Sequence, residues 1–216
     1  MNMPDIRWNT ISANMREMMV AFATAPISDN FYLAGWTALA LQLGHRRSAD
    51  LDFFSQTKDI PTLIGPLLAS LAQFEPQLAD SFWGNLVFLV RGVRIGFYGY
   101  GYDLLQPLIK SEGTGLASVM DIGLMKLEAV LGRAGRKDFI DLYEICKHHS
   151  LRELLDLAPR KYPGVRDFET QVVKRLVYFE QAEKDAHFPM LVPVDWDVVK
   201  GFFQEQAEEI GKQWIG

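Results

Sequence analysis

The stretch that decides the fold runs from Phe31 to Ser55 and reads FYLAGWTALALQLGHRRSADLDFFS. It begins with a short apolar run at 31–34, ended by Gly35, which predicts a strand followed by a turn. Residues 37–43 are apolar at nearly every position and rich in helix formers, so we expect a short buried helix there. Residues 50–54 again have the composition of a strand.

The second predicted strand carries two acidic residues. Side chains of a strand alternate between faces, so Asp50 and Asp52 project from one side and Leu51 and Phe53 from the other. Two carboxylates this close repel each other, and an apolar strand tolerates the pair when a cation lies between them. Mg²⁺ prefers such oxygen ligands and usually keeps positions open for substrate phosphates. The pattern therefore predicts a magnesium site.

The turn and helix before this strand suit a phosphate group. Gly35 allows the backbone to approach a ligand closely. A helix that begins near Thr37 directs N–H groups and the positive end of its dipole at an anion, and the threonine hydroxyl can add a donor. Together with the acidic pair, this arrangement predicts a nucleoside triphosphate beside a metal ion.

The segment His45–Ser48 between helix and strand is basic. Arg46 and Arg47 have two interpretations: a solvated loop, or a contact with phosphate or RNA beside the metal, which we favour because guanidinium groups match phosphate oxygens. The acidic pair also has alternatives, namely a solvated strand end or the metal site of a nucleotide-sugar glycosyltransferase. The glycine turn and helix directly before the acids argue against both.

Residues 33–54, LAGWTALALQLGHRRSADLDFF, resemble the nucleotidyltransferase signature of the DNA polymerase β-like superfamily. More closely, they are similar to the AbiEii/AbiGii toxin family, whose usual form is G-G-T-A-L…L…H-R-x-S-x-D-h-D. The resemblance implies that Asp50 and Asp52 bind the metal and that the preceding residues bind the nucleotide: Gly35, Trp36, Thr37, Arg46, Arg47 and Ser48. Trp36 replaces the second glycine of the family, and its indole either blocks the site or stacks on a base.

The superfamily usually places a third carboxylate on a later strand. The matching strand here is predicted at 93–98, where Gly96 occupies the position expected for an acid. Asp103 follows the strand and is a poor substitute by position. A site with two aspartates remains possible, because Mg²⁺ often takes only one or two protein carboxylates.

The resemblance resumes at residues 125–145, MKLEAVLGRAGRKDFIDLYEI, which match the family's second block, K-L-x-A…R…R-D-x-x-D-L. It implies that Lys126 holds the triphosphate and that an aspartate assists catalysis. Helical spacing would also allow a salt-bridge network that locks two helices together. The residues concerned are Lys126, Arg133, Lys137, Asp138 and Asp141.

Composition limits the remaining possibilities. The chain has 216 residues, of which 49% are hydrophobic, a formal charge of −5 and a single cysteine, Cys146. One cysteine excludes an intrachain disulfide and is typical of a reducing compartment. No signal pattern or long apolar run is present, so we expect a soluble cytoplasmic protein without a membrane segment. Since the chain is acidic, an RNA substrate would need a local basic patch.

The expected fold class is α+β: a nucleotidyltransferase-like mixed sheet of four or five strands with helices, followed by a helical C-terminal half. We place a palm-like α/β domain at 1–110 and a helical domain, beginning with a Gly/Ser loop, at 111–216. Further strands are expected at 80–83, 86–90 and 93–98, the last two joined by a tight turn. Further helices are expected at 9–25, 60–74, 122–132, 137–147, 151–159, 168–182 and 195–214.

The sequence thus predicts an Mg²⁺-dependent nucleotidyltransferase that transfers a nucleoside monophosphate from a triphosphate to an acceptor. The resemblance implies a toxin of a toxin–antitoxin or phage-defence system, with RNA, in particular tRNA, as acceptor and an antitoxin protein as partner. The alternative is a catalytically degenerate protein of the same fold that binds a nucleotide or a partner. Trp36 and the missing third acid motivate this alternative.

Overall fold

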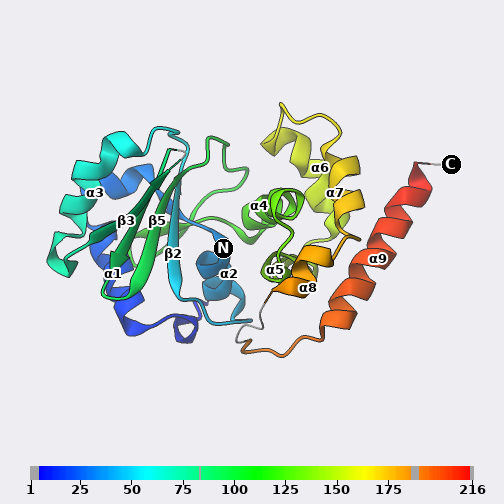
Figure 1. Ribbon diagram of the computed structural model, residues 1–216, viewed down its shortest axis with the longest axis horizontal. Coiled ribbons are helices and arrows are strands. Elements are labelled where there is room, and N and C mark those ends of the chain that lie inside the picture. The colour runs from blue at the N-terminus through cyan, green and yellow to red at the C-terminus, as the bar shows by residue number, and fades with distance from the viewer. Residues whose placement is uncertain (1–4, 83, 186–189, 215–216) are drawn as a thin grey trace. The chain divides into compact units, whose positions relative to one another are not determined.

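The computed structural model of the protein describes residues 5–82, 84–185 and 190–214. The chain forms two compact units, Met1–Ser118 and Val119–Gly216. The first contains the sheet and the second is helical (Figure 1). The fold class is therefore the predicted α+β class, with a mixed sheet and a helical C-terminal half.

The sheet of the first unit has seven strands in the order β3-β4-β5-β2-β1-β7-β6. Strand β2 pairs in parallel with β5 and antiparallel with β1, so the sheet is mixed. The strands are β1 (Tyr32–Leu33), β2 (Asp50–Ser55), β3 (Gln77–Phe82), β4 (Asn85–Val90), β5 (Val93–Gly99), β6 (Ile109–Ser111) and β7 (Thr114–Leu116).

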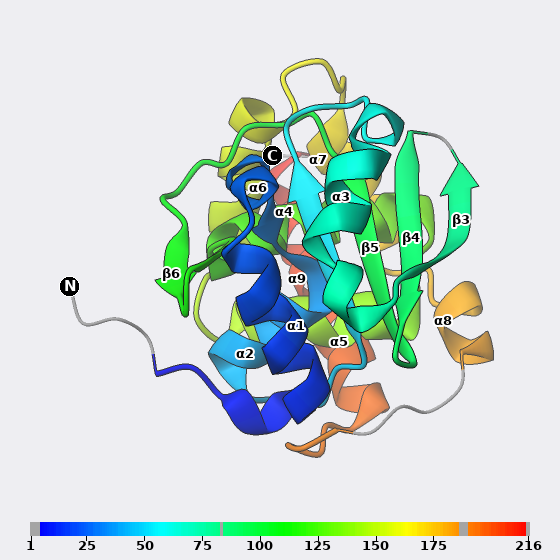
Figure 2. The same ribbon diagram turned by 90° about the vertical axis from the view of Figure 1, so that its left-hand side faces the viewer.

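Two helices of this unit cover one face of the sheet, α1 (Ala13–Ala23) and α3 (Ile64–Ser70) (Figure 2). The buried side of α1 carries methionines and Phe22, whose ring lies 4.6 Å from that of Phe53 on β2. Aromatic stacking continues from Phe53 to Phe97 on β5, with ring centroids 5.5 Å apart. The apolar face of β2 and β5 is thus the centre of the core, as the alternation of the sequence indicates.

The helix of the deciding stretch, α2 (Gly35–Leu43), is buried along most of its length. It ends at Gly44, which adopts φ +70°, a left-handed conformation that glycine accepts without a steric penalty. The predicted strand, helix and strand between residues 31 and 54 are all confirmed.

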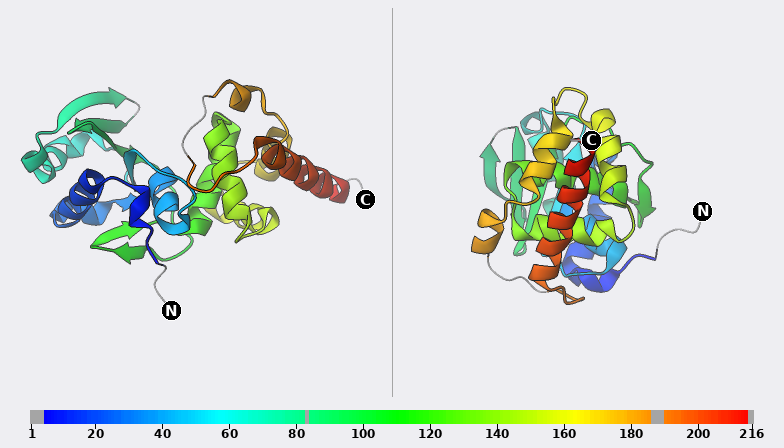
Figure 3. Two further views of the ribbon diagram at one scale, coloured as in Figure 1. Left: turned by 90° about the horizontal axis from the view of Figure 1, so that it is seen from below. Right: turned by 90° about the vertical axis from the view of Figure 1, so that its right-hand side faces the viewer.

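In its described residues, 119–185 and 190–214, the second unit has six helices. They are α4 (Val119–Gly132), α5 (Arg136–Cys146), α6 (Leu151–Lys161), α7 (Phe168–Arg175), α8 (Glu180–Lys184) and α9 (Trp196–Gln213). Helix α4 packs against α5, α6 and α7, and α9 lies against α5 and α7 (Figure 3). Within the described residues, no helix combines the length and apolar character needed to cross a bilayer.

Two predictions about the sheet were wrong. The sheet has seven strands where four or five were expected, because the Gly/Ser segment predicted as a loop forms the β6–β7 hairpin. Glu112 and Gly113, with φ +48° and +84°, make its turn. Strands of three residues carry too little alternation to be recognised from sequence. Trp83, assigned to the strand at 80–83, lies outside the described residues.

Three helix predictions also needed correction. The segment predicted at 60–74 is helical as α3 only from Ile64 to Ser70, with 3₁₀ turns on both sides. Helix α6 continues past Pro159 to Lys161, because a capping box between Ser150 and Glu153 and a buried leucine face hold it. The helix expected at 168–182 breaks into α7 and α8, because Phe179 turns inward to pack on Phe139 and Trp196.

Candidate functional site

The acidic residues of β2 lie on the face of the sheet opposite α1. Burial alternates along β2, with Leu51 and Phe53 fully buried and Asp50 and Asp52 partly exposed. Since Phe53 packs on Phe22 of α1, the carboxylates project from the other face. The predicted separation of the two sides of this strand is confirmed.

The glycine turn lies directly beside Asp52. Gly35 has φ +62°, in the left-handed region that favours glycine. A Cβ atom at this position would lie 3.7 Å from Oδ2 of Asp52. The first turn of α2, whose N–H groups have no partner within the helix, therefore begins beside Asp52. This is the geometry that brings an anion and a cation together.

Thr37 fixes the position of Asp50. Its hydroxyl lies 2.7 Å from Oγ of Ser48 and donates to the backbone carbonyl of Asp50. The threonine is 1% exposed. In the structure these hydrogen bonds tie α2 to the start of β2, so Thr37 and Ser48 position the acidic strand. A direct contact of the threonine with phosphate stays a prediction.

Trp36 and Arg46 form a pair at the start of α2. The guanidinium carbon of Arg46 lies 5.0 Å from the centroid of the indole ring, which is the geometry of a cation–π contact. Arg46 is only 2% exposed, whereas Arg47 is exposed. Of the two arginines, Arg47 is thus the one accessible to an acceptor. A contact by Arg46 would require its side chain to leave the indole.

The neighbouring strand places Gly96 opposite Asp52. In the parallel register of β2 and β5, Asp50 pairs with Arg94 and Asp52 with Gly96. A guanidinium nitrogen of Arg94 lies 3.7 Å from Oδ1 of Asp52. The position expected for a third acid therefore has no carboxylate, and a cation lies beside it. Asp103 instead accepts a hydrogen bond from Gln56.

Tyr98 completes this group of side chains. Its side chain interacts with both Asp52 and Arg94. Burial, followed by the negative charge of Asp52, raises the pKa of Tyr98 to about 12, so the phenol is protonated at neutral pH. Sequence analysis missed Arg94 and Tyr98. The sequence shows that Arg94, Gly96 and Tyr98 occupy alternate positions of one strand. It does not show the register of β5 with β2, which brings Arg94 and Tyr98 to Asp52.

The residues present fit a magnesium ion that takes few protein ligands. Asp50 and Asp52 supply two carboxylates on one face, and the Gly35 turn leaves room for phosphate oxygens beside them. Across residues 5–82, 84–185 and 190–214, no group of three His, Cys, Asp or Glu side chains is arranged to hold a metal. The donor set would thus hold Mg²⁺ through two aspartates, with water and phosphate completing the coordination.

The second predicted set of site residues lies in the helical unit. Nζ of Lys126 is 3.1 Å from Asp138 and 2.8 Å from Asp141, and all three side chains are at most 4% exposed. Arg133 donates two hydrogen bonds to Asp138, at 2.7 and 2.8 Å. Although burial raises the pKa of Asp138, Lys126 and Arg133 outweigh it and hold that pKa below the usual value. Lys137 lies on α5, the helix of Asp138 and Asp141, and is partly exposed.

The group Lys126, Arg133, Asp138 and Asp141 is called the α4–α5 ion cluster below; its members are buried except for Arg133, whose side chain is 60% exposed. It joins two helices with two positive and two negative charges. The distances favour the salt-bridge interpretation of the sequence pattern. The implied contacts of Lys126 and Lys137 with a triphosphate, and a catalytic role for Asp138 or Asp141, stay predictions.

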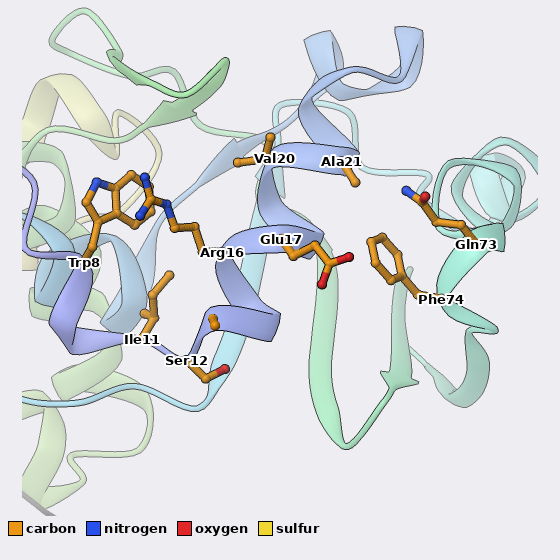
Figure 4. Close-up of a pocket in the computed structure, with 10 residues that line it drawn as sticks. Trp8, Ile11, Ser12, Arg16, Glu17, Val20, Ala21, Gln73 and Phe74 are labelled. Carbon is orange, nitrogen blue, oxygen red and sulfur yellow. The ribbon is translucent and has the colours of Figure 1, made fainter.

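A pocket of about 680 Å³ in the first unit lies away from the acidic strand. It is lined by residues along α1 and by Phe74, on the side of the sheet that α1 covers (Figure 4). Its polar side chains include Arg16 and Glu17, and the Arg16 guanidinium lies 4.2 Å from the Trp8 ring. The pocket lacks a pair of carboxylates beside a helix start, so we assign the chemistry to the face of Asp50 and Asp52.

The fold defines the class of protein. A crystal structure of a candidate nucleotidyltransferase from H. pylori is similar to this chain, with a TM-score of 0.55, 19% sequence identity and coverage of 96% of this chain and 97% of that one. At this identity the comparison shows the fold alone. The chain therefore has a nucleotidyltransferase-like fold, in agreement with the superfamily that the sequence resembles.

The sequence itself defines the family. Over 209 residues the chain is 32% identical to the uncharacterized protein aq_aa25 of Aquifex aeolicus, which covers 92% of this chain and 97% of that protein. This chain belongs to the same family as the Aquifex aeolicus protein. No family model matches the chain, so the closer resemblance to AbiEii/AbiGii toxins stays a proposal.

Proposed function

We propose that the protein is an Mg²⁺-dependent nucleotidyltransferase, which transfers a nucleoside monophosphate from a nucleoside triphosphate to an acceptor hydroxyl. One observation carries the proposal. Gly35 opens a helix in a left-handed conformation, and a Cβ atom at this position would lie 3.7 Å from Oδ2 of Asp52, on the strand face that also bears Asp50. Phosphate and divalent metal would thus bind side by side, as phosphoryl transfer requires.

In this proposal each group has a physical task. Asp50 and Asp52 hold Mg²⁺, which when bound supplies positive charge to the oxygens of the reacting phosphoryl group. The backbone at Gly35 and the first N–H groups of α2 bind triphosphate oxygens. Thr37 and Ser48 keep Asp50 in place. The acceptor oxygen bonds to the α-phosphorus, its proton passes to water, and pyrophosphate leaves.

The acceptor and biological role rest on the resemblance to the AbiEii/AbiGii toxin family. We propose RNA, in particular tRNA, as acceptor, and a role as the toxin of a toxin–antitoxin or phage-defence system with an antitoxin protein as partner. The formal charge of −5 argues against binding RNA by bulk charge. Exposed Arg47, three residues before Asp50, is the proposed local contact for the acceptor backbone.

The test is incubation of the full-length protein with each α-labelled triphosphate, Mg²⁺ and total RNA. We expect label in RNA with the unmodified protein and a loss of at least 100-fold in the Asp50→Asn/Asp52→Asn variant. The control Asp59→Asn/Asp80→Asn removes the same charge from two exposed positions of the same unit and should retain activity. Label transfer that survives neutralisation of Asp50 and Asp52 would refute the assignment.

A second function is favoured by a specific observation: the Arg94 guanidinium beside Asp52 and the indole of Trp36 at the helix start. Both could make the protein a binder of nucleotide or partner without turnover. Calorimetry with nucleotides separates the two, because binding without product in any acceptor favours this alternative. The Trp36→Gly variant restores the glycine of the family. Activity that appears only in this variant would establish that the natural protein is a binder.

A further inference from the structure

The aromatic side chain of Tyr98 occupies the space in which an acidic side chain at position 96 would lie. Because β2 and β5 are parallel and in register, a side chain at 96 would project beside Asp52. A Cβ atom on Gly96 would lie 2.3 Å from the hydroxyl oxygen of Tyr98 and 2.4 Å from a ring carbon. The tyrosine therefore lies over the glycine and fills the space that a third carboxylate would use.

The charge beside Asp52 is also opposite in sign to that of a third acid. Arg94 lies 3.7 Å from Asp52, and its side chain is 46% exposed compared with 19% for Asp52. The side chain of Tyr98 interacts with both groups. Where a third acid would strengthen the attraction for a divalent cation, the chain has a positive charge.

A divalent cation and a guanidinium compete for the same carboxylate. A free metal ion gains two carboxylates but meets the repulsion of Arg94 at short range. A metal ion that arrives with a triphosphate brings phosphate oxygens, which are a better partner for the guanidinium than a shared carboxylate. The exposed side chain of Arg94 has the freedom to move from one partner to the other.

We propose that Arg94 is a built-in counter-ion of Asp52 that makes divalent-metal binding depend on the nucleotide. The metal alone binds weakly. The metal–triphosphate complex binds well because its phosphate oxygens take over the guanidinium. The inference rests on the proposed function, since it presumes that Asp50 and Asp52 are the metal ligands.

The test measures binding of Mn²⁺, as a paramagnetic probe for Mg²⁺, with and without a non-hydrolysable triphosphate analogue. Free Mn²⁺ is followed by electron paramagnetic resonance, so no turnover is needed. In the unmodified protein we expect the analogue to tighten Mn²⁺ binding at least tenfold. In Arg94→Gln we expect Mn²⁺ alone to bind about tenfold tighter than in the unmodified protein, and the effect of the analogue to shrink.

Three variants make the result specific. Arg94→Lys retains the charge and should retain weak binding of Mn²⁺ alone. Arg91→Gln removes the same charge from the β4–β5 turn, where the side chain lies over Phe74, and should change nothing. Tyr98→Phe keeps the ring over Gly96 but removes the hydroxyl that interacts with Asp52 and Arg94, and should give a gain in affinity smaller than that of Arg94→Gln.

The outcomes separate this inference from the function on which it rests. Equal affinity for Mn²⁺ alone in the unmodified protein and in Arg94→Gln, with nucleotide-dependent binding intact, would overturn the role of Arg94 and leave the metal site standing. Absence of Mn²⁺ binding in every variant, with and without the analogue, would overturn the metal site itself. Unchanged thermal unfolding of each variant excludes loss of the fold as the cause.

Discussion

Replacing Lys126 with methionine tests whether the α4–α5 ion cluster is a structural lock. Methionine retains the length and apolar stem of the side chain and removes the charge. The ammonium contacts two carboxylates, at 3.1 and 2.8 Å, whose side chains are 1% and 0% exposed. After the substitution, Arg133 remains paired with Asp138, and the positive charge of Lys126 beside Asp141 is lost. Breaking a buried pair in this way typically costs about 3–5 kcal/mol.

The loss of folding stability in Lys126→Met has an upper limit that depends on pH. One carboxylate can relieve the excess charge by taking up a proton. At pH 7, protonating an aspartate costs about 4 kcal/mol, because pH 7 lies roughly three units above an ordinary aspartate pKa and each unit corresponds to about 1.4 kcal/mol. At pH 5 the same relief costs only about 1.5 kcal/mol. We therefore expect Lys126→Met to be strongly destabilised at pH 7 and much less so at pH 5.

The assay is thermal unfolding of the full chain followed by circular dichroism at both pH values. A loss of about 4 kcal/mol corresponds to a Tm lower by about 10 °C in a chain of this size. The control is Lys212→Met, which breaks an exposed pair with Glu208 on α9 and should shift the Tm by about 1 °C at most. A shift of less than 2 °C at pH 7 in Lys126→Met would refute the structural lock. If nucleotide binding is then lost with stability unchanged, the triphosphate role implied by the resemblance is favoured.

Further predictions concern single residues of both units. The pKa of Asp138 is lowered in the folded protein, so the contribution of this carboxylate to stability is present above the ordinary aspartate pKa of 3.8 and is lost as the pH falls through the folded value. In acid titrations of Asp138→Asn, the loss of stability below about pH 4 should therefore be shallower than in the unmodified protein. Thr37→Val leaves Ser48 and the Asp50 carbonyl without the threonine hydroxyl and should cost about 1–2 kcal/mol in chemical denaturation, whereas Thr62→Val at an exposed position should be nearly neutral. Burial of much of the Cys146 side chain raises the pKa of its thiol to about 12, so a thiol reagent at pH 8 should label the native protein much more slowly than the denatured protein; equal rates of labelling would contradict the raised pKa.

The deciding stretch was predictable because each of its elements is locally encoded. Gly35 and Gly44 occupy left-handed positions that bracket α2, and the alternation around Asp52 separates an apolar face from a polar one. Such signals act over a few residues, so they survive in the sequence alone. The acidic face of β2 and its association with a glycine turn could therefore be expected before the fold was known.

The parts that sequence reasoning missed depend on pairing between distant segments. The β6–β7 hairpin is too short for a periodic signal, and it is held by the pairing of Leu116 with Leu33 of β1. The break between α7 and α8 is imposed by contacts of Phe179 with Phe139, forty residues earlier in the chain. In both cases tertiary packing outweighs local propensity.

The sequence by itself determined which residue types are available to the site: two aspartates at alternate positions, a glycine that opens a helix, and a glycine where an acid would be expected. Only the tertiary structure decided what those residues meet, since the register of β2 and β5 brings Arg94 and Tyr98 to Asp52. The physical reason is that alternation fixes the face of a side chain, whereas strand pairing across forty residues fixes its neighbours.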